Sequence, residues 1–258
     1  MRIATWNING LRARVDFLLL WLKERKPDLV GLQEIKIEDK NFFYETLETE
    51  GYYALVHGQK AWNGVAILSR EPLQLVQKGL PGEDEMGARL ISARLGELNF
   101  TTIYCPNGKQ VTHADFQRKL KWLDSLSQYL KKEQHPSQSA IVCGDFNICP
   151  SPLDTWNEEL FNGEIFHTQE ERMRFQHLLD YGLFDIYREL QPDDHSFSWW
   201  DYRGGAFHKN EGLRIDFLLS TSPILKKTQR VIIDREYRKK RVNLTPSDHV
   251  PVWIDLDD

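Results

Sequence analysis

Short apolar runs recur along the whole chain, and they limit its possible folds more than any other feature. They are rich in Val, Ile, Leu and Thr, as β-strands are. Several are apolar at nearly every residue, which is typical of strands buried on both faces of a sheet. We therefore predict strands in RIATWNI, LVGLQE, GVAILS, RLISARL, LNFTTIYC, SAIVCGDFNI, LRIDFLLS and VPVWIDL.

Helical patterns lie between these strands. Val15, Leu18, Leu19 and Leu22 follow the i, i+3, i+4, i+7 spacing of one helix face, and Pro27 predicts where that helix ends. Strands and helices do not alternate strictly. The order of elements therefore favours a layered α/β protein with largely antiparallel sheets over a doubly wound parallel sheet.

Two further helices carry start signals. Thr112 and Asp115 resemble a capping box at the start of a long apolar-faced helix. Thr168 and Glu171 repeat the pattern, and Gly182 is placed to end that third helix. A glycine-rich and charged segment, residues 201–210, is expected to form a long exposed loop.

Length and composition describe an ordinary globular protein. The 258 residues fit a single domain spanning 1–258, since single α/β domains often reach this length. No apolar run approaches the roughly 20 residues that cross a bilayer. The opening MRIATWNI lacks the pattern of a signal peptide. We therefore predict a cytoplasmic protein with no membrane partner.

Cysteine content and net charge narrow the class further. Cys105, Cys143 and Cys149 form no C-x-x-C pair, so reduced, buried thiols are expected. The net charge of -5 argues against a protein held on nucleic acid by bulk electrostatics alone. It still permits a nucleic-acid enzyme, because metal-binding carboxylates lower the net charge and leave a basic rim.

Acids, amides and one histidine stand at the edges of the apolar runs. Because an unpaired buried carboxylate costs free energy, this repeated placement predicts that the side chains converge on something positive. Oxygen ligands with no cysteine and at most one histidine suit Mg²⁺, with Mn²⁺ as a possible substitute, better than zinc. The residues concerned are Asn7, Glu34, Asp145, Asn147, Asp216, Asp248 and His249.

Mg²⁺ is usually held by one or two carboxylates together with a substrate phosphate. A metal that neutralises phosphoryl oxygens, a carboxylate that orients water and a histidine that stabilises charge would make a phosphodiester hydrolase. Each residue alone has a plainer interpretation. GDFN and SDHVP fit simple turns, Glu34 could pair with Lys36 at the surface, and Tyr104 could belong to the core. The complete set, in this order, favours an active site.

Seven motifs carry a resemblance to a known family. WNINGLRA at 6–13, LQEIK at 32–36, YCPNG at 104–108, GDFNI at 144–148, FSWWDYR at 197–203, GLRIDFLL at 212–219 and PSDHVPVW at 246–253 closely resemble the exonuclease III family of DNA-repair nucleases. That family belongs to the wider endonuclease/exonuclease/phosphatase superfamily. The resemblance covers nearly the whole chain in one collinear order.

The resemblance implies a fold and a catalytic centre. The fold is of the α+β type of α/β protein: a four-layer sandwich of two mainly antiparallel or mixed β-sheets, flanked by helices, with the active site at one edge between the sheets. The implied metal ligands are Asn7, Glu34, Asp145, Asn147 and Asp248. The implied catalytic residues are Tyr104 near the scissile phosphate, Asp145 and Asn147 at the attacking water, and Asp216 orienting His249.

The chemistry agrees with these implied roles. An aspartate that accepts from a histidine fixes its tautomer and favours its charged form. His249 is then expected to stabilise negative charge in the transition state. Asp145 is the better candidate for the base, and a metal-bound hydroxide is its competitor.

The resemblance also implies a DNA-binding surface and a partner. The partner is double-stranded DNA with 3′ ends, nicks or abasic sites, bound by a protein that acts as a monomer. Arg12, Arg14 and Lys209 are further candidates for backbone contacts, which position DNA without reading its sequence. The implied DNA-binding residues are Lys36, Asn107, Phe166, His167, Trp199, Tyr202, Arg203, Leu213 and Ile215. Of the adjacent Trp199 and Trp200, one is expected to pack inward.

Three alternative functions have to be weighed. Phosphatases and sphingomyelinase-like phosphodiesterases share the Glu and SDH elements, but WNINGLRA and GLRIDFLL resemble the DNA-repair branch more closely. A catalytically inactive DNA-binding or scaffold module predicts losses at the metal and histidine positions, and none is seen. Cleavage at abasic sites as the main activity is the alternative within the family.

One departure from the family pattern bears on the lesion. Typical members carry a small residue, then Phe, then a TPxER or LPxER pattern before the third helix, whereas this chain reads FHTQEER from Phe166. Bulky side chains therefore occupy positions at which the family pattern leaves space. We therefore predict that Phe166 or His167 obstructs continuous DNA at an abasic site, which favours 3′-exonuclease and 3′-phosphatase or phosphodiesterase activity over abasic-site incision.

Overall fold

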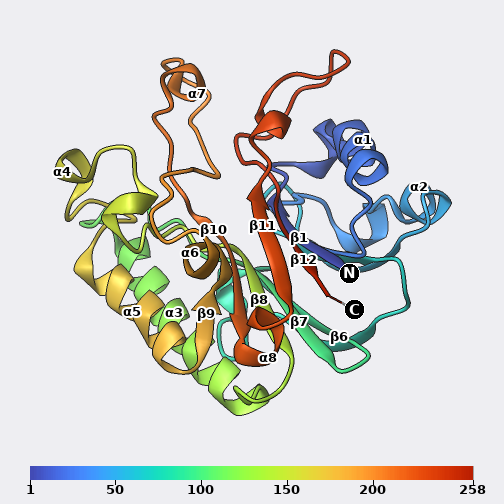
Figure 1. Ribbon diagram of the computed structural model, residues 1–258, viewed down its shortest axis with the longest axis horizontal. Helices are drawn as coiled ribbons and strands as arrows, with labels where there is room; N and C mark the ends of the chain where they lie inside the picture. The colour runs from blue at the N-terminus through green and yellow to red at the C-terminus, as the bar shows by residue number, and fades with distance from the viewer. Residues whose placement is uncertain (258) are drawn as a thin grey trace.

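Two β-sheets pack face to face between outer helices in a computed structural model that describes residues 1–257 (Figure 1). The first sheet has six strands in the order β11-β12-β1-β2-β4-β3, and its one parallel pair is β1 with β2. Its strands are β1 Arg2–Asn7, β2 Leu29–Gln33, β3 Tyr53–His57, β4 Val65–Ser69, β11 Thr228–Ile233 and β12 Val252–Leu256.

The second sheet repeats this plan. It has six strands in the order β5-β6-β7-β8-β10-β9, and its one parallel pair is β7 with β8. Its strands are β5 Gln74–Lys78, β6 Leu90–Leu95, β7 Leu98–Tyr104, β8 Ala140–Asp145, β9 Leu183–Asp185 and β10 Asp216–Thr221. The predicted sandwich of two mixed, mainly antiparallel sheets is confirmed.

Helices cover the outer face of each sheet, with α1 and α2 outside the first and α3 and α5 outside the second (Figure 1). Short helices occupy the connecting segments, and no helix of the described residues is long and apolar enough to cross a membrane. The α-helices are α1 Val15–Arg25, α2 Tyr44–Thr49, α3 Ala114–Glu133, α4 Glu158–Phe161, α5 Gln169–Asp180, α6 Ile186–Leu190, α7 Ala206–Lys209 and α8 Ser222–Leu225.

Three of the four predicted helix starts and ends are correct. The Thr168 and Glu171 capping box forms at the start of α5, that helix ends just before Gly182, and α1 ends just before Pro27. The predicted cap at Thr112 is wrong. Helix α3 begins later, because the His113 side chain, not that of Thr112, accepts the hydrogen bond from the Asp115 amide.

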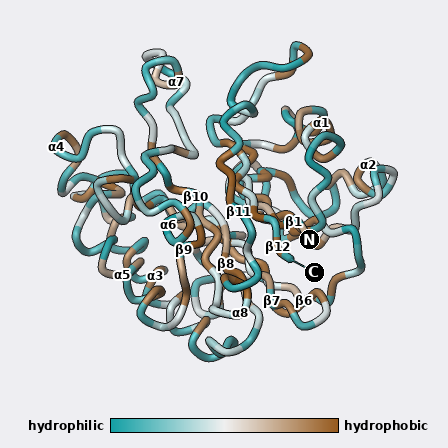
Figure 2. The backbone as a smooth tube through the Cα atoms, in the orientation of Figure 1, coloured by the Kyte–Doolittle hydropathy of each residue, from teal (hydrophilic) through white to brown (hydrophobic). Residues whose placement is uncertain are grey.

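Both faces of the central strands are buried, which explains their continuous apolar runs. On β10, Leu218 packs between the sheets while Phe217 and Leu219 pack beneath α3 and α5. Figure 2 shows the hydrophobic residues gathered along these strands, with the protruding loops largely hydrophilic. The sheets approach closely at Gly31, where an added Cβ would lie 2.6 Å from Thr102 Oγ1.

Four strands were not predicted, and all four are sheet edges. They are β3, β5, β9 and β11. Edge strands expose part of their surface, so β5 reads QLVQK, of which four residues are exposed and one is half-buried. Such a strand lacks the apolar run that identifies a central strand. Strand β9 has only three residues, too few to show a pattern.

Candidate active site

The predicted polar residues converge at one end of the sandwich, between the two sheets. Asn7 ends β1 and Glu34 follows β2, which is parallel to it. In the second sheet Tyr104 ends β7 and lies in register with Asp145 at the end of β8, which in turn lies opposite Asp216 on β10. The carboxyl ends of the two parallel pairs therefore meet at the same site. Asn7, Glu34, Asp145, Asp216 and His249 form what we call the catalytic cluster.

Asn7 joins the two sheets within this cluster. Its Nδ2 donates to Glu34 Oε1 at 2.8 Å and to Asp145 Oδ2 at 2.9 Å. Its side-chain Oδ1 accepts from the Asn9 backbone amide at 3.0 Å. Lys36 Nζ lies 2.8 Å from the second oxygen of Glu34. In this arrangement Asn7 orients the two carboxylates, and its role as a metal ligand stays a prediction.

His249 is held by a hydrogen-bonded chain from β10. Its Nδ1 lies 2.8 Å from Asp216 Oδ2, which also accepts from Ser198 Oγ at 2.6 Å. Its Nε2 faces Asp145 Oδ2 at 3.8 Å. Burial disfavours the charged imidazole, but the nearby carboxylates, Asp216 foremost, outweigh it and raise the pKa of His249 to about 10. The histidine therefore carries a positive charge at neutral pH.

Burial and crowding of like charges act on the acids around it. Burial raises the pKa of Asp145 to about 7; His249 opposes this rise, whereas Asp216 and Glu34 add to it. Tyr104 has a pKa well above its ordinary value for the same reasons, first burial and then the charges of Glu34 and Asp145. The carboxylates of the cluster thus carry more negative charge than the neighbouring cations of the protein neutralise.

Three side chains at the centre of the cluster place possible ligand atoms close together. Glu34, Asp145 and His249 each offer one such atom, and these atoms lie within 4.8 Å of one another. Because the charged imidazole of His249 has no free lone pair, the two carboxylates are the groups that suit a hard divalent cation. These residues therefore fit a divalent metal of the kind that the sequence predicted.

Two other predicted ligands, Asn147 and Asp248, lie beside these residues and form hydrogen bonds within the surrounding loops. Asn147 Nδ2 donates to the Cys105 carbonyl at 2.9 Å, and its amide donates to Asp145 Oδ1 at 2.9 Å. Asp248 Oδ1 accepts from Asn9 Nδ2 at 2.9 Å, and its Oδ2 accepts from the indole of Trp199 at 3.0 Å. These oxygens already have partners within the protein.

Two supporting residues were missed from the sequence. Ser198 sits in SFSWW with no pattern that marks it. Lys119 is fully buried, where its ammonium pairs with Glu171 and donates to the carbonyls of Asn147 at 2.6 Å and Asn107 at 3.3 Å. A signal for Lys119 did exist, since it interrupts the apolar face of α3 between Phe116 and Leu120.

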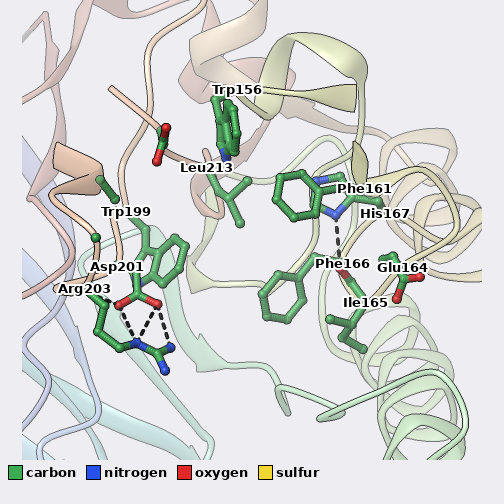
Figure 3. A pocket seen from close by; sticks show the side chains of 13 residues that line it. Trp156, Phe161, Glu164, Ile165, Phe166, His167, Trp199, Asp201, Arg203 and Leu213 are labelled. Atoms are coloured by element: carbon green, nitrogen blue, oxygen red, sulfur yellow. Dashed lines mark hydrogen bonds and ion pairs between the residues drawn. The ribbon is translucent and has the colours of Figure 1, made fainter. Parts of the chain in front are cut away.

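A cavity of about 510 Å³ opens beside the cluster (Figure 3). Trp199 forms one wall, with its ring 6.4 Å from that of His249. Phe166 and Leu213 line it as well, and Arg203 lies at its rim in an ion pair with Asp201. Trp200 is the inward-packing tryptophan and is fully buried, as expected for one of the pair.

The wall formed by α4 and the segment before α5 is built from rings. His167 lines the cavity but is only 2 % exposed, because its ring stacks on Phe161 at 5.2 Å and its Nδ1 lies 3.0 Å from the Ile165 carbonyl. Phe166 adopts a left-handed backbone with a φ of 73°. Such a conformation is costly for a bulky residue, so the surrounding packing has to enforce it.

Three predicted DNA-binding residues do not line this cavity, and their contact with DNA stays a prediction. Ile215, which was expected to help line it, packs behind Leu213, where it is 2 % exposed. Tyr202 lines a different cavity, and its hydroxyl donates to the Pro246 carbonyl at 2.9 Å. Asn107 is exposed on the loop after β7, away from the cavity lining. Lys36 lies at the metal-side carboxylate, as described above.

Comparison with known proteins places this geometry in a family. A family model described as Endonuclease/Exonuclease/phosphatase family matches residues 4–249. Exodeoxyribonuclease III of Haemophilus influenzae is 38 % identical over 99 % of this chain and 100 % of its own. The predicted resemblance to the exonuclease III family is confirmed.

Two solved structures are similar over the full length. An AP endonuclease from Archaeoglobus fulgidus superposes with a TM-score of 0.96 at 32 % identity, covering 100 % of both chains. The 3′ phosphatase NExo from Neisseria, bound to product DNA hairpin, superposes with a TM-score of 0.95 at 35 % identity, covering 100 % of this chain and 99 % of its own. Similar folds therefore accompany different named activities.

Proposed function

The chain belongs to the endonuclease/exonuclease/phosphatase family as a DNA-repair nuclease of the exonuclease III type, and from this premise we propose that it is a Mg²⁺-dependent hydrolase acting mainly at DNA 3′ ends. Its substrates are double-stranded DNA with recessed, nicked or 3′-phosphorylated ends, and it acts as a monomer. The proposed preference for 3′ ends rests on one observation, the wall of aromatic and imidazole rings in the cavity beside His249.

The wall selects between substrates by steric obstruction. A cavity of about 510 Å³ is in the range of small-ligand pockets and has room for one nucleotide. Phe166 and the stacked pair Phe161 and His167 close its side opposite Trp199 (Figure 3). A terminal nucleotide has one backbone connection, whereas an abasic nucleotide inside a strand has two. The rings therefore obstruct the second connection and leave a 3′ terminus free to enter.

The catalytic cluster supplies the proton transfers and the charge stabilisation. Asp145 has a pKa of about 7, which suits a base that takes a proton from the attacking water near neutral pH. His249, charged and oriented by Asp216, donates to a phosphate oxygen as negative charge builds. Lys36 and Asn7 hold the Glu34 carboxylate in place.

Glu34 and Asp145 are the carboxylates that would hold Mg²⁺. When bound there, the cation would supply neutralising charge to the phosphoryl oxygens. Metal binding has a readout other than activity. Addition of Mg²⁺ is expected to raise the melting temperature above that in EDTA, since a ligand that binds only the folded state stabilises it. Glu34→Gln is expected to remove that rise, and a rise of parental size in Glu34→Gln would contradict this assignment.

Three duplexes test the substrate preference: an abasic duplex, a nick with a 3′ phosphate, and a plain recessed 3′ end, each with Mg²⁺ and with EDTA. We expect hydrolysis of both 3′-end substrates, slower incision of the abasic duplex, and no reaction in EDTA. Abasic incision as fast as 3′-end hydrolysis would favour the second candidate, a main activity at abasic sites, which the likeness to the Archaeoglobus fulgidus AP endonuclease supports.

His167→Gly and Phe166→Gly test the wall itself. Each is expected to raise abasic incision by about tenfold, equivalent to roughly 1.4 kcal/mol of barrier. Glycine also tolerates the left-handed backbone at 166. Hydrolysis of the recessed 3′ end by each variant is the internal control. If abasic incision does not rise in either variant, the rings do not select the substrate.

A further inference from the structure

A second cavity, of about 410 Å³, lies next to the first and has no part in the chemistry above. It opens between the loop that carries α7 and the segment that follows β11, which rise at the same end of the molecule (Figure 1). Its lining includes Tyr202, His208, Arg238, Lys239 and Lys240. Asp201 and Ala206 line both cavities, so the two adjoin.

Arg238 is the unusual residue of this second cavity. It is only 9 % exposed, yet no carboxylate of the described residues lies within ion-pair distance of its guanidinium. Its Nη2 donates to the Trp200 carbonyl at 3.2 Å, and its buried Nε has no partner among the described residues. Its guanidinium stacks over Tyr202 at 4.7 Å and over Phe207 at 5.5 Å. The stacking fixes its position without neutralising its charge.

A buried arginine without an acid is costly, because desolvation of a charge is offset only by a partner of opposite charge. The pKa of Arg238 shows this cost, since burial lowers it from its ordinary value and the more distant charges of Asp248 and Asp201 offset only part of that effect. The more deeply buried Arg214 shows the usual solution, with Asp154 and Asp185 each 2.7 Å away. Arg238 therefore has unused capacity for an anion.

The surroundings of Arg238 are positive as well. Lys240 also lines the cavity and has no ion-pair partner in residues 1–257. Lys239 is paired with Glu236 at 2.7 Å. The one acid of the lining, Asp201, is already engaged by Arg203 at 2.7 Å. The cavity thus presents positive charge in excess.

We propose that this second cavity binds a phosphate group of the DNA strand whose terminal nucleotide occupies the first cavity, with Arg238 as its principal donor and Lys240 as a second. A planar guanidinium matches a phosphate by bidentate hydrogen bonds. Because the cavities adjoin, the phosphate belongs to a nucleotide near the reacting one. The site rests on the proposed DNA-directed function and anchors the strand away from the metal-binding carboxylates.

The test is a double-mutant cycle between protein and DNA. A hairpin with a recessed 3′ end is prepared with a neutral methylphosphonate at each successive backbone position, and its affinity is measured in EDTA, where hydrolysis is excluded. Neutralising one phosphate near the 3′ end is expected to weaken parental binding by about tenfold and to leave Arg238→Met, which already lacks the contact, unaffected. The salt dependence of log K is expected to fall by about 0.9 in the variant, the value for one phosphate contact.

Arg235→Met is the matched control. Arg235 also stacks on Phe207, at 4.2 Å, but does not line the cavity. Its variant is expected to keep the parental sensitivity to every methylphosphonate. Lys240→Met, at an exposed position that does not support packing, is expected to reduce the same sensitivity partly. This variant keeps the test valid even if Arg238→Met folds poorly.

Further measurements distinguish a terminal phosphate from a backbone phosphate, and failure of this site from failure of the proposed function. A nicked duplex with or without a 5′ phosphate distinguishes a terminal phosphate from a backbone one, and we expect no difference. If no methylphosphonate position couples to Arg238 or Lys240, or if Arg235→Met behaves like Arg238→Met, the site is refuted. Failure of the proposed function would appear separately, as absence of 3′-end hydrolysis by the parent.

Discussion

Two groups of buried charges in this protein differ in how their charges are balanced. In the catalytic cluster, Glu34, Asp145 and Asp216 surround the single imidazole of His249. In the second group, Arg214 lies between Asp154 and Asp185, and Arg188 also reaches Asp154. We call Arg214, Arg188, Asp154 and Asp185 the arginine cluster.

The same residue type responds in opposite ways in the two clusters. Burial acts to raise the pKa of both Asp145 and Asp154. At Asp154 the adjacent Arg214 outweighs burial, and its pKa falls below the ordinary value. At Asp145 the neighbouring acids add to burial, and its pKa rises to about 7. Burial alone therefore does not distinguish a structural acid from a reactive one, whereas the charge of its neighbours does.

The difference between the two clusters indicates which of them binds a ligand. The arginine cluster is neutral, so it stabilises the fold without an added charge, although the buried Nε of Arg188 has no hydrogen-bond partner. The catalytic cluster leaves acceptor capacity unused, including Asp216 Oδ1, which is buried without a partner. An excess of one charge sign in a buried group is thus the physical sign of a site that completes itself with a ligand.

The largest effect is expected from Asp145→Asn. Removal of the base should lower kcat on a recessed 3′ end by about 10²- to 10⁴-fold. Stability in EDTA should stay unchanged or rise, because one charge of an acidic excess is removed. Asp154→Asn is the matched control, with lower stability and parental kcat per folded molecule. Steady-state rates and urea unfolding measure both, and equal losses of rate in the two variants would erase the distinction between the clusters.

Arg214→Met should have the next largest effect, and on stability. It leaves Asp185 buried without a cation and Asp154 with Arg188 alone, which costs about 3–5 kcal/mol of unfolding free energy. Urea unfolding measures it, with Arg188→Met as the control. Arg188 is 22 % exposed and should cost less. A loss no larger than that of Arg188→Met would mean that Arg214 is not the centre of the cluster.

In EDTA, the free energy of unfolding should change with pH in opposite directions for the two clusters. The folded state holds the Asp145 proton up to a pH of about 7, whereas the ordinary value is 3.8. The folded protein therefore binds more protons in that window, and the contribution of Asp145 to stability falls as pH rises from about 4 to about 7.

Asp154 has the opposite sign, since its pKa is lowered on folding. Its contribution is present above its ordinary pKa and is lost as the pH falls through the folded value. Urea unfolding across this range measures both groups. Asp145→Asn should flatten the fall between about pH 4 and about pH 7, and an unaltered slope in that variant would be the contrary result.

The smallest effect is expected from two serines in equivalent roles. Ser198 donates to Asp216 at 2.6 Å, and Ser151 donates to Asp154 at 2.8 Å. Ser198→Ala should lower kcat by about tenfold, because the hydrogen bond to a charged group is worth roughly 1.5–3 kcal/mol, and leave KM unchanged. Ser151→Ala should lower only the free energy of unfolding, by about 1 kcal/mol. Equal kcat values for the two variants would show that Ser198 has no positioning role.

The sequence alone predicted the central strands and the residues that converge in the catalytic cluster. Strands buried on both faces have to be apolar at nearly every residue, and the amide and carboxylates of Asn7, Asp145 and Asp216 stand at strand ends. A buried charge is too costly to be placed there by chance. Signals of this kind are local, so they can be read without the fold.

Tertiary structure alone decided what depends on packing between distant segments. The edge strands carry no apolar run, since their burial depends on a neighbour. The hydrogen bond from Ser198 to Asp216, the stacking of His167 on Phe161, and the lack of an ion-pair partner for Arg238 among the described residues are likewise invisible in a linear order. Residue types determined which chemistry is possible, and the folded arrangement decided which charges are satisfied and which remain free for a ligand, because that balance is set by neighbours far apart in sequence.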